Sequence, residues 1–249
     1  VDCEKTYDLI VVGGGMAGTC AAIAANRYGM NVLLLQDRDM LGGCNSSEVR
    51  VALGGELGKG PYPAIGKVVR DIQPYYGDGD PHDGKYYEDA RKEIPFTMAK
   101  DRKTRWNCPF PEADLVYRQY VYAVEMAPGT NRIAAVVALD TRTGVRTRFR
   151  APLFVDATGD ADLVAFAGGS YEKGDANGGV MPATLCTLWG GVDFRNRSDF
   201  TEQTAQLEVA LKDGHFSVPD RHLTGITPTP GAPSGTGGGN VGHVFGVDP

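Results

Sequence analysis

Residues 7–18 read YDLIVVGGGMAG, and this stretch decides the fold. Its apolar run, residues 9–12, is rich in β-branched side chains, which predicts a short strand buried on both faces. Glycines then follow in G-x-G-x-x-G spacing at Gly13, Gly15 and Gly18. In this motif the first glycine permits a tight turn, the second lets a pyrophosphate approach the backbone, and the third lets helix and strand pack closely. The stretch therefore predicts a dinucleotide site.

The residues that follow complete a strand–helix–strand unit. A helix is predicted over residues 16–28, and it opens at Met16 and Ala17, whose N-terminal end should face the phosphates. A second apolar run at residues 31–35 predicts a second parallel strand. Gln36 ends this strand, where an acid usually holds the ribose of a dinucleotide. The amide can still exchange hydrogen bonds with ribose hydroxyls, and an ordinary surface position is the alternative.

Composition restricts the class of protein. The chain has 249 residues, 42% of them hydrophobic and 22% charged, as in an ordinary globular protein of one large domain or two smaller ones. Its net charge of −6 argues against nucleic acid as the main partner. No apolar run approaches the ~20 residues that span a bilayer. Basic residues gather between positions 91 and 105 with acids mixed in, which predicts a solvated surface loop.

Cysteines and histidines give no sign of a metal centre. The five cysteines lack C-x-x-C spacing and the four histidines lack the spacing of metal ligands, so we expect neither a disulfide framework nor a metal site. The sequence begins at a valine and shows no signal peptide. The compartment stays open: the cytoplasm is the first expectation, and the periplasm or secretion after removal of a signal is the alternative.

A second glycine motif distinguishes between cofactors. Residues 36–51 read QDRDMLGGCNSSEVRV, and a nicotinamide-binding domain has no need of this glycine pair. With both motifs present, the chain resembles the FAD-dependent oxidoreductases of the glutathione-reductase fold, related to fumarate-reductase and heterodisulfide-reductase flavoproteins. The resemblance implies FAD as cofactor. It also implies that the second motif contacts FAD through Asp37, Arg38, Gly42, Gly43, Asn45 and Ser46.

Two later segments extend the resemblance. Residues 120–126, 132–139 and 145–150 predict three strands of an antiparallel meander, and the family places the backbone near Val121 against the adenine. The third FAD motif is matched by LFVDATGDADL at residues 153–163. Here the resemblance implies close passage of the cofactor at Ala157, Thr158, Gly159 and Asp160. The alternative is a plain strand-to-helix turn in which Asp162 caps the next helix.

Two charged residues are the catalytic candidates. Glu48 and Arg50 follow the second motif on a segment that should pass near the flavin. A hydride transfer needs an acid or base and a group that stabilises developing charge. Glu48 would exchange a proton with the substrate, and Arg50 would hold a carboxylate or an oxyanion. The alternative is that they pair with each other or with surface residues.

The chain is thus expected to have an α/β fold with a Rossmann-like FAD domain at residues 1–170, interrupted by an insertion at about 56–107. Residues 171–249 should begin a substrate or cap domain, including a helix at 202–212. Seven glycines after residue 230 suggest a flexible linker or a chain cut short within a longer protein.

The predicted function is hydride transfer between a small polar organic substrate and FAD. An NAD(P)-dependent dehydrogenase and a non-catalytic dinucleotide-binding protein are the alternatives. The identity of the substrate, the electron acceptor and the oligomeric state stay open, because fold does not fix function.

Overall fold

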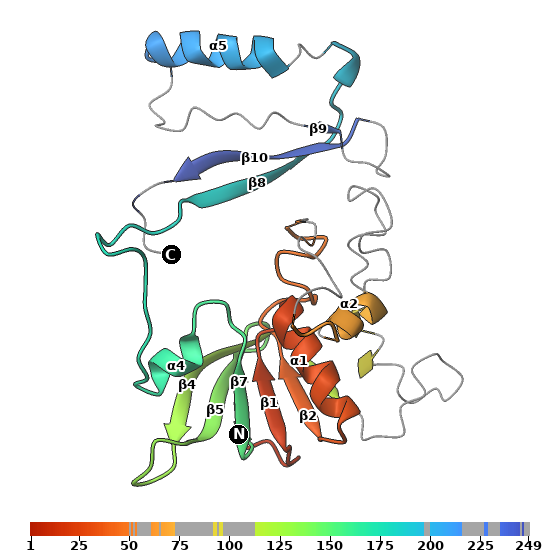
Figure 1. Cartoon of the computed structure of the whole chain (residues 1–249), viewed down its shortest axis with the longest axis vertical. Helices are drawn as coiled ribbons and strands as arrows, with labels where there is room; N and C mark the ends of the chain where they lie inside the picture. The colour runs from red at the N-terminus through yellow and green to blue at the C-terminus, as the bar shows by residue number, and fades with distance from the viewer. Residues whose placement is uncertain are drawn as a thin grey trace. The chain divides into compact units, whose positions relative to one another are not determined.

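A computed structural model describes residues 1–49, 51, 53, 61–64, 66–72, 92–93, 95–96, 113–196, 200–215, 227–228, 235–244 and 246. The described chain divides into two compact units between Tyr171 and Glu172. Figure 1 shows the elements of both units. The roles expected for the two parts of the chain, cofactor binding and substrate binding, remain predictions.

A four-stranded parallel sheet is the centre of the first unit. Its order is β3 (Asp114–Val116), β2 (Val32–Leu35), β1 (Leu9–Val12), β7 (Leu153–Asp156), and every neighbouring pair is parallel. Helix α1 (Met16–Arg27) connects β1 to β2 and packs against both strands. The α/β fold class is confirmed. The three-residue strand β3 was not expected, because it lies next to a long segment without a periodic pattern.

Alternating side chains of the parallel strands form two separate cores. Ile10 and Leu33 pack with residues of an antiparallel sheet on one face, whereas Val11 and Leu34 pack with α1 on the other. Every residue of β1 and β2 is buried. This two-sided burial explains why these strands are continuous apolar runs rather than alternating ones.

The antiparallel sheet is the predicted meander. It has the order β4 (Gln119–Met126), β5 (Ile133–Asp140), β6 (Arg146–Arg150). Helix α2 (Gly66–Ile72) contacts α1, and helix α4 (Asp162–Phe166) follows β7. The parallel sheet therefore lies between the meander and the α1 layer.

The second unit contains a three-stranded antiparallel sheet of order β8-β10-β9, formed by Ala183–Trp189, Gly237–Val244 and Thr227–Pro228. A 3₁₀ turn, η2 (Phe194–Asn196), precedes helix α5 (Phe200–Lys212), and α5 spans the helix expected at 202–212. The glycine-rich stretch is β10, a paired strand, so the linker interpretation is wrong for residues 237–244. The glycine content suggested a linker, but a strand can pair with β8 through backbone hydrogen bonds that need no side chain.

Candidate functional site

All three glycine-containing motifs meet at one edge of the parallel sheet. The register pairs Val12 with Leu35 and with Asp156, so β1, β2 and β7 end together. Backbone bonds continue past the strand ends, from the Gly13 N–H to the Leu35 carbonyl at 2.9 Å and from the Ala157 N–H to the Val12 carbonyl at 2.8 Å. In open α/β sheets, ligands bind outside the carboxyl ends of the strands. The three motifs thus lie where such a ligand is expected.

The glycines of the first motif have different surroundings. A Cβ on Gly13 would lie 2.2 Å from the Ala157 carbonyl oxygen, and a Cβ on Gly18 would lie 1.9 Å from the Gly13 oxygen. Both positions therefore require glycine for protein packing alone. A Cβ on Gly15 would meet no described atom within 4 Å. The space beside Gly15 is left open by the protein, as a site for a pyrophosphate requires.

The N-terminus of α1 borders this open space. Gly15 is the N-cap residue, no side chain caps the helix, and its first turn, which includes Met16 and Ala17, contains no acid. The first N–H groups of a helix have no partner within the helix, and the helix dipole makes this end positive. An uncapped, acid-free N-terminus of a 12-residue helix suits a phosphate.

Gln36 braces the first motif from inside the protein. Its side-chain oxygen accepts a hydrogen bond from the Gly14 N–H at 2.7 Å, and its amide nitrogen donates to the Met40 carbonyl at 3.0 Å. Only 4% of the residue is exposed, so the alternative of a surface position is wrong. The predicted contact with a ribose remains a prediction. Asp37 and Arg38, which follow, are exposed.

The second motif is joined directly to the first. The Gly42 N–H donates to the Gly14 carbonyl at 2.8 Å, and Gly42 forms an isolated parallel bridge with Gly15. Gly42 has φ = +113°, and a Cβ on Gly43 would lie 3.2 Å from the Gly15 Cα. The hydroxyl of Ser46 is turned inward and donates to the Gly43 carbonyl at 2.7 Å. These contacts bring the backbone of the second motif beside the open space at Gly15.

A buried lysine supports the second motif, which the sequence did not suggest. Lys92 is 0% exposed, and its Nζ donates to the backbone oxygen of Asn45 at 2.6 Å. The expectation of a solvated basic loop is therefore wrong for Lys92. The other basic residues of that run lie outside the described residues. Asn45 is itself buried, and its side-chain oxygen Oδ1 has no donor among the described residues.

The third motif is organised by Asp156 at the end of β7. Its Oδ1 accepts hydrogen bonds from the Thr158 N–H at 3.2 Å and the Thr158 hydroxyl at 2.8 Å, and its Oδ2 accepts one from the Val164 N–H at 3.1 Å. The N-cap residue of α4 is Ala161, with φ = 58°, and no side chain caps from that position. The alternative in which Asp162 caps the helix is therefore wrong.

Negative charge gathers around this turn. Burial raises the pKa of the Asp162 carboxyl above its ordinary value, and neighbouring carboxylates raise it further, those of Asp160, Asp156 and Asp37. Asp37 lies two residues after the end of β2, and Asp160 belongs to the third motif.

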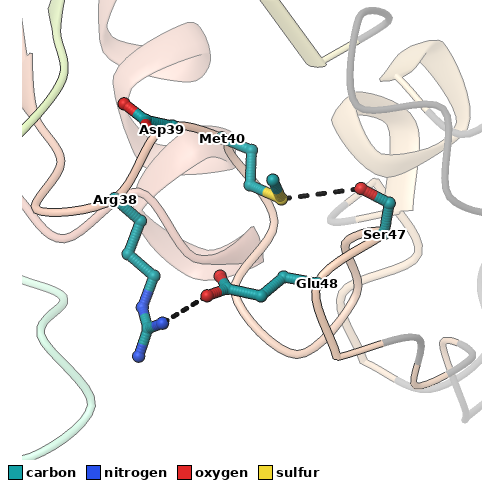
Figure 2. A pocket seen from close by; sticks show the side chains of 5 residues that line it. All are labelled: Arg38, Asp39, Met40, Ser47 and Glu48. Carbon is teal, nitrogen blue, oxygen red and sulfur yellow. Dashed lines mark hydrogen bonds and ion pairs between the residues drawn. The ribbon is translucent and has the colours of Figure 1, made fainter. Parts of the chain in front are cut away.

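A pocket of about 400 Å³ opens between the end of β2 and the second motif. Figure 2 shows its lining, which is formed by Arg38, Asp39, Met40, Ser47 and Glu48. Glu48 forms an ion pair with Arg38, and the two side chains are 36% and 57% exposed. Glu48 thus pairs with a surface residue, and its exchange of a proton with a substrate remains a prediction. Arg50, the other catalytic candidate, lies outside the described residues.

Val121 lies in β4, where its side chain is buried in the core between the two sheets. The prediction from the sequence was that the backbone near Val121, rather than its side chain, contacts the adenine of FAD. β4 is an edge strand, and its pairing with β5 shifts register between Val121 and Ala123. Contact of this backbone with an adenine remains a prediction.

No metal centre or membrane span is found in the described part of the chain. It contains no group of three or more His, Cys, Asp or Glu residues that could hold a metal ion. None of its helices has both the length and the apolar character needed to cross a bilayer.

The fold and site define a dinucleotide-binding α/β protein, and sequence comparison identifies its family. The family of FAD dependent oxidoreductases matches residues 8–236, so the chain belongs to this family. The family identifies the cofactor as FAD and argues against the nicotinamide alternative. The open space at Gly15, the uncapped α1 and the adjoining second motif fit the diphosphate of FAD.

Individual relatives match over parts of their length. The chain is 53% identical over 36 residues to flavin-containing amine oxidase A of Sus scrofa, a match covering 14% of this chain and 7% of the relative. It is 44% identical over 73 residues to the tRNA uridine 5-carboxymethylaminomethyl modification enzyme MnmG of Geobacter metallireducens, covering 24% and 12%.

A solved structure shares the fold over almost the whole chain. This is the glycerol-3-phosphate dehydrogenase from Bacillus halodurans complexed with FAD, at a TM-score of 0.52 and 16% identity. The match covers 99% of this chain and 49% of the dehydrogenase. The chain therefore spans about half of this neighbour and a small fraction of the curated relatives.

Proposed function

We propose that the whole protein transfers a hydride between a small polar organic substrate and FAD, and that this chain carries its cofactor cradle. The observation that supports the proposal is the meeting of three motifs at one sheet edge, where Gly15 faces open space. Bound FAD would supply the electron-accepting and electron-donating chemistry that no side chain provides. The residues of the chain would bind, orient and exchange protons.

The cradle would hold FAD mainly through backbone groups. The N–H groups at the start of α1, at Met16 and Ala17, would bind the diphosphate, because they combine free donors with the positive end of the helix. The backbone of Gly42 and Gly43 would approach closely, because neither residue has a side chain. Asp160, exposed on the third motif, would accept hydrogen bonds from a cofactor hydroxyl.

Proton transfer is assigned to Glu48 in the pocket. A carboxylate positioned in this way can take a proton from a substrate hydroxyl as hydride leaves the adjoining carbon. Arg38, paired with Glu48, would attract an anionic substrate group towards the pocket. Arg50 keeps its predicted role in holding a carboxylate or an oxyanion.

Anaerobic reduction of the FAD-loaded protein tests this proposal. Hydroxy acids and sugars would be added in turn, and loss of the visible flavin band would report hydride transfer. We expect Glu48→Gln to slow reduction by about 10²-fold or more while leaving the FAD content unchanged. The matched change Glu4→Gln, at an exposed residue that precedes β1 and belongs to none of the three motifs, should have no effect.

Two results would contradict the proposal. If the Glu48→Gln variant is reduced at the wild-type rate by a working substrate, Glu48 does not exchange the proton. If bound FAD stays oxidised with every candidate and also cannot be reoxidised by enoates or quinones after photoreduction, the protein is a non-catalytic dinucleotide-binding protein.

A further inference from the structure

Lys92 is a buried charged residue to which the predicted chemistry gives no role. It is 0% exposed, whereas lysine is almost never fully buried unless its ammonium is paired or hydrogen-bonded. Removing an ammonium from water is strongly unfavourable unless oxygen atoms replace the water. The ammonium of Lys92 must therefore be stabilised by acceptor atoms of the protein itself.

The contacts of Lys92 fall on the second motif. Its Nζ donates to the backbone oxygen of Asn45 at 2.6 Å, and a Cβ on Gly42 would lie 2.9 Å from both its Cε and its Nζ. Gly42 therefore leaves room for the lysine as well as for the bridge to Gly15. The same turn is closed by a bond from the Asn45 N–H to the Gly42 carbonyl at 3.0 Å.

These contacts form a continuous path from the ammonium to the open space. Lys92 holds Asn45, Asn45 closes the turn on Gly42, and Gly42 pairs with Gly14 and Gly15 of the first motif. We propose that Lys92 is a positioning residue for the cofactor, which fixes the turn from Gly42 to Ser46 in the conformation that receives FAD. This inference rests on the proposed FAD site.

The variant Lys92→Met tests it, because methionine preserves the unbranched shape and removes the charge and the N–H donors. The exposed Lys67→Met change in α2 is the matched control. Two quantities are measured on the apoprotein: the Kd for FAD, from quenching of flavin fluorescence, and the rise in Tm that saturating FAD produces. Ligand binding to the folded state stabilises it in proportion to the logarithm of affinity, so the two quantities check each other.

We expect Lys92→Met to weaken FAD binding by ~10-fold or more, as for loss of one hydrogen bond to a charged group, and to reduce the FAD-induced rise in Tm. Lys67→Met should leave both unchanged. Lys92→Gln, which keeps an N–H donor without the charge, should recover part of the affinity. A residue that only stabilised the fold would lower the Tm of the apoprotein and leave the Kd unaltered.

Three results would overturn the inference. The first is a Lys92→Met variant whose Kd lies within twofold of the wild-type value. The second is a lower Tm of the apoprotein with an unchanged FAD-induced rise. The third is failure of both Lys92→Met and Lys92→Gln to fold, which assigns the lysine to the core. If the wild-type protein itself does not bind FAD, the proposed function fails, and that result is distinct from these three.

Discussion

At the scale of single residues, different glycines of the first motif are required for packing and for ligand binding. A Cβ added to Gly15 would meet no described atom within 4 Å. A Cβ added to Gly18, three residues later, would lie 1.9 Å from the backbone oxygen of Gly13. We predict that Gly18→Ala lowers the free energy of unfolding of the apoprotein by ~2 kcal/mol or more, through overpacking.

Gly15→Ala serves as the matched variant. It should change apoprotein stability by no more than ~1 kcal/mol, which is the cost of losing a favourable N-cap residue. Its affinity for FAD should nevertheless fall, because the methyl group enters the space meant for phosphate. Urea unfolding and FAD titration of both variants provide the measurements. Equal losses of stability in the two variants would contradict this assignment.

Asp162 makes the stability of the fold depend on pH, and its surroundings determine the sign of this dependence. Burial and neighbouring carboxylates raise the pKa of Asp162 in the folded protein above the ordinary value of 3.8. A raised carboxyl pKa means that the folded state binds protons more readily than the unfolded state, so stability is lost progressively as the pH rises from 3.8, and the loss is complete above the folded pKa. We predict that Asp162→Asn raises the urea midpoint at pH 7.

The predicted gain should disappear as the pH falls towards 3.8, because the wild-type carboxyl is then protonated in the folded state. Unfolding of both proteins at a series of pH values measures the difference. Asp213→Asn, at an exposed residue of the second unit, controls for a general effect of removing negative charge. A gain that persists undiminished at acid pH would show that Asp162 is not the source.

At the scale of elements, α4 depends on a side chain from the preceding strand. Asp156 accepts hydrogen bonds from the Thr158 N–H, the Thr158 hydroxyl and the Val164 N–H. We predict that Asp156→Ala costs ~1–2 kcal/mol of stability, as for loss of a helix cap, and that Asp156→Asn costs less because one acceptor oxygen remains. Asp160→Ala should not lower stability, because Asp160 is exposed and its charge repels that of Asp162, but it should weaken FAD binding. Unchanged stability of Asp156→Ala would contradict the cap.

Elements with a local sequence signal were predicted closely. β1, α1 and β2 follow from an apolar run, small residues at helical spacing and a second apolar run, and the meander follows from alternation between turn residues. β3 is too short to give a periodic pattern. β10 is stabilised by pairing with β8, a contact between distant segments that glycine composition conceals.

In the site, too, features with a local sequence pattern were predicted, whereas features that depend on contacts between distant segments were not. The glycine spacing placed Gly13, Gly15 and Gly18 correctly at the strand-to-helix turn. No local pattern distinguishes Lys92 from its basic neighbours, because its burial comes from packing against the second motif. Gln36 occupies the position expected from the family, but its bond to the Gly14 N–H is visible only in the folded chain.

At the scale of the whole molecule, the parallel sheet brings together segments more than a hundred residues apart. β1 pairs with β2 on one side and with β7 on the other, so the three motifs share one edge although β7 begins at Leu153. The chain spans 49% of the length of the glycerol-3-phosphate dehydrogenase it resembles in fold. Substrate specificity therefore need not reside in the described residues, whereas the proposed cofactor cradle lies among them.

Uptake of FAD by the purified protein is the measurement that tests this cradle most directly. Apoprotein would be titrated with FAD, and bound flavin would be followed by fluorescence quenching and by the visible spectrum after gel filtration. We expect stoichiometric retention by the wild-type protein and none by Gly15→Val, whose larger side chain fills the open space while the fold remains. A folded wild-type protein that retains no FAD, or a Gly15→Val variant with normal flavin content, would contradict the account.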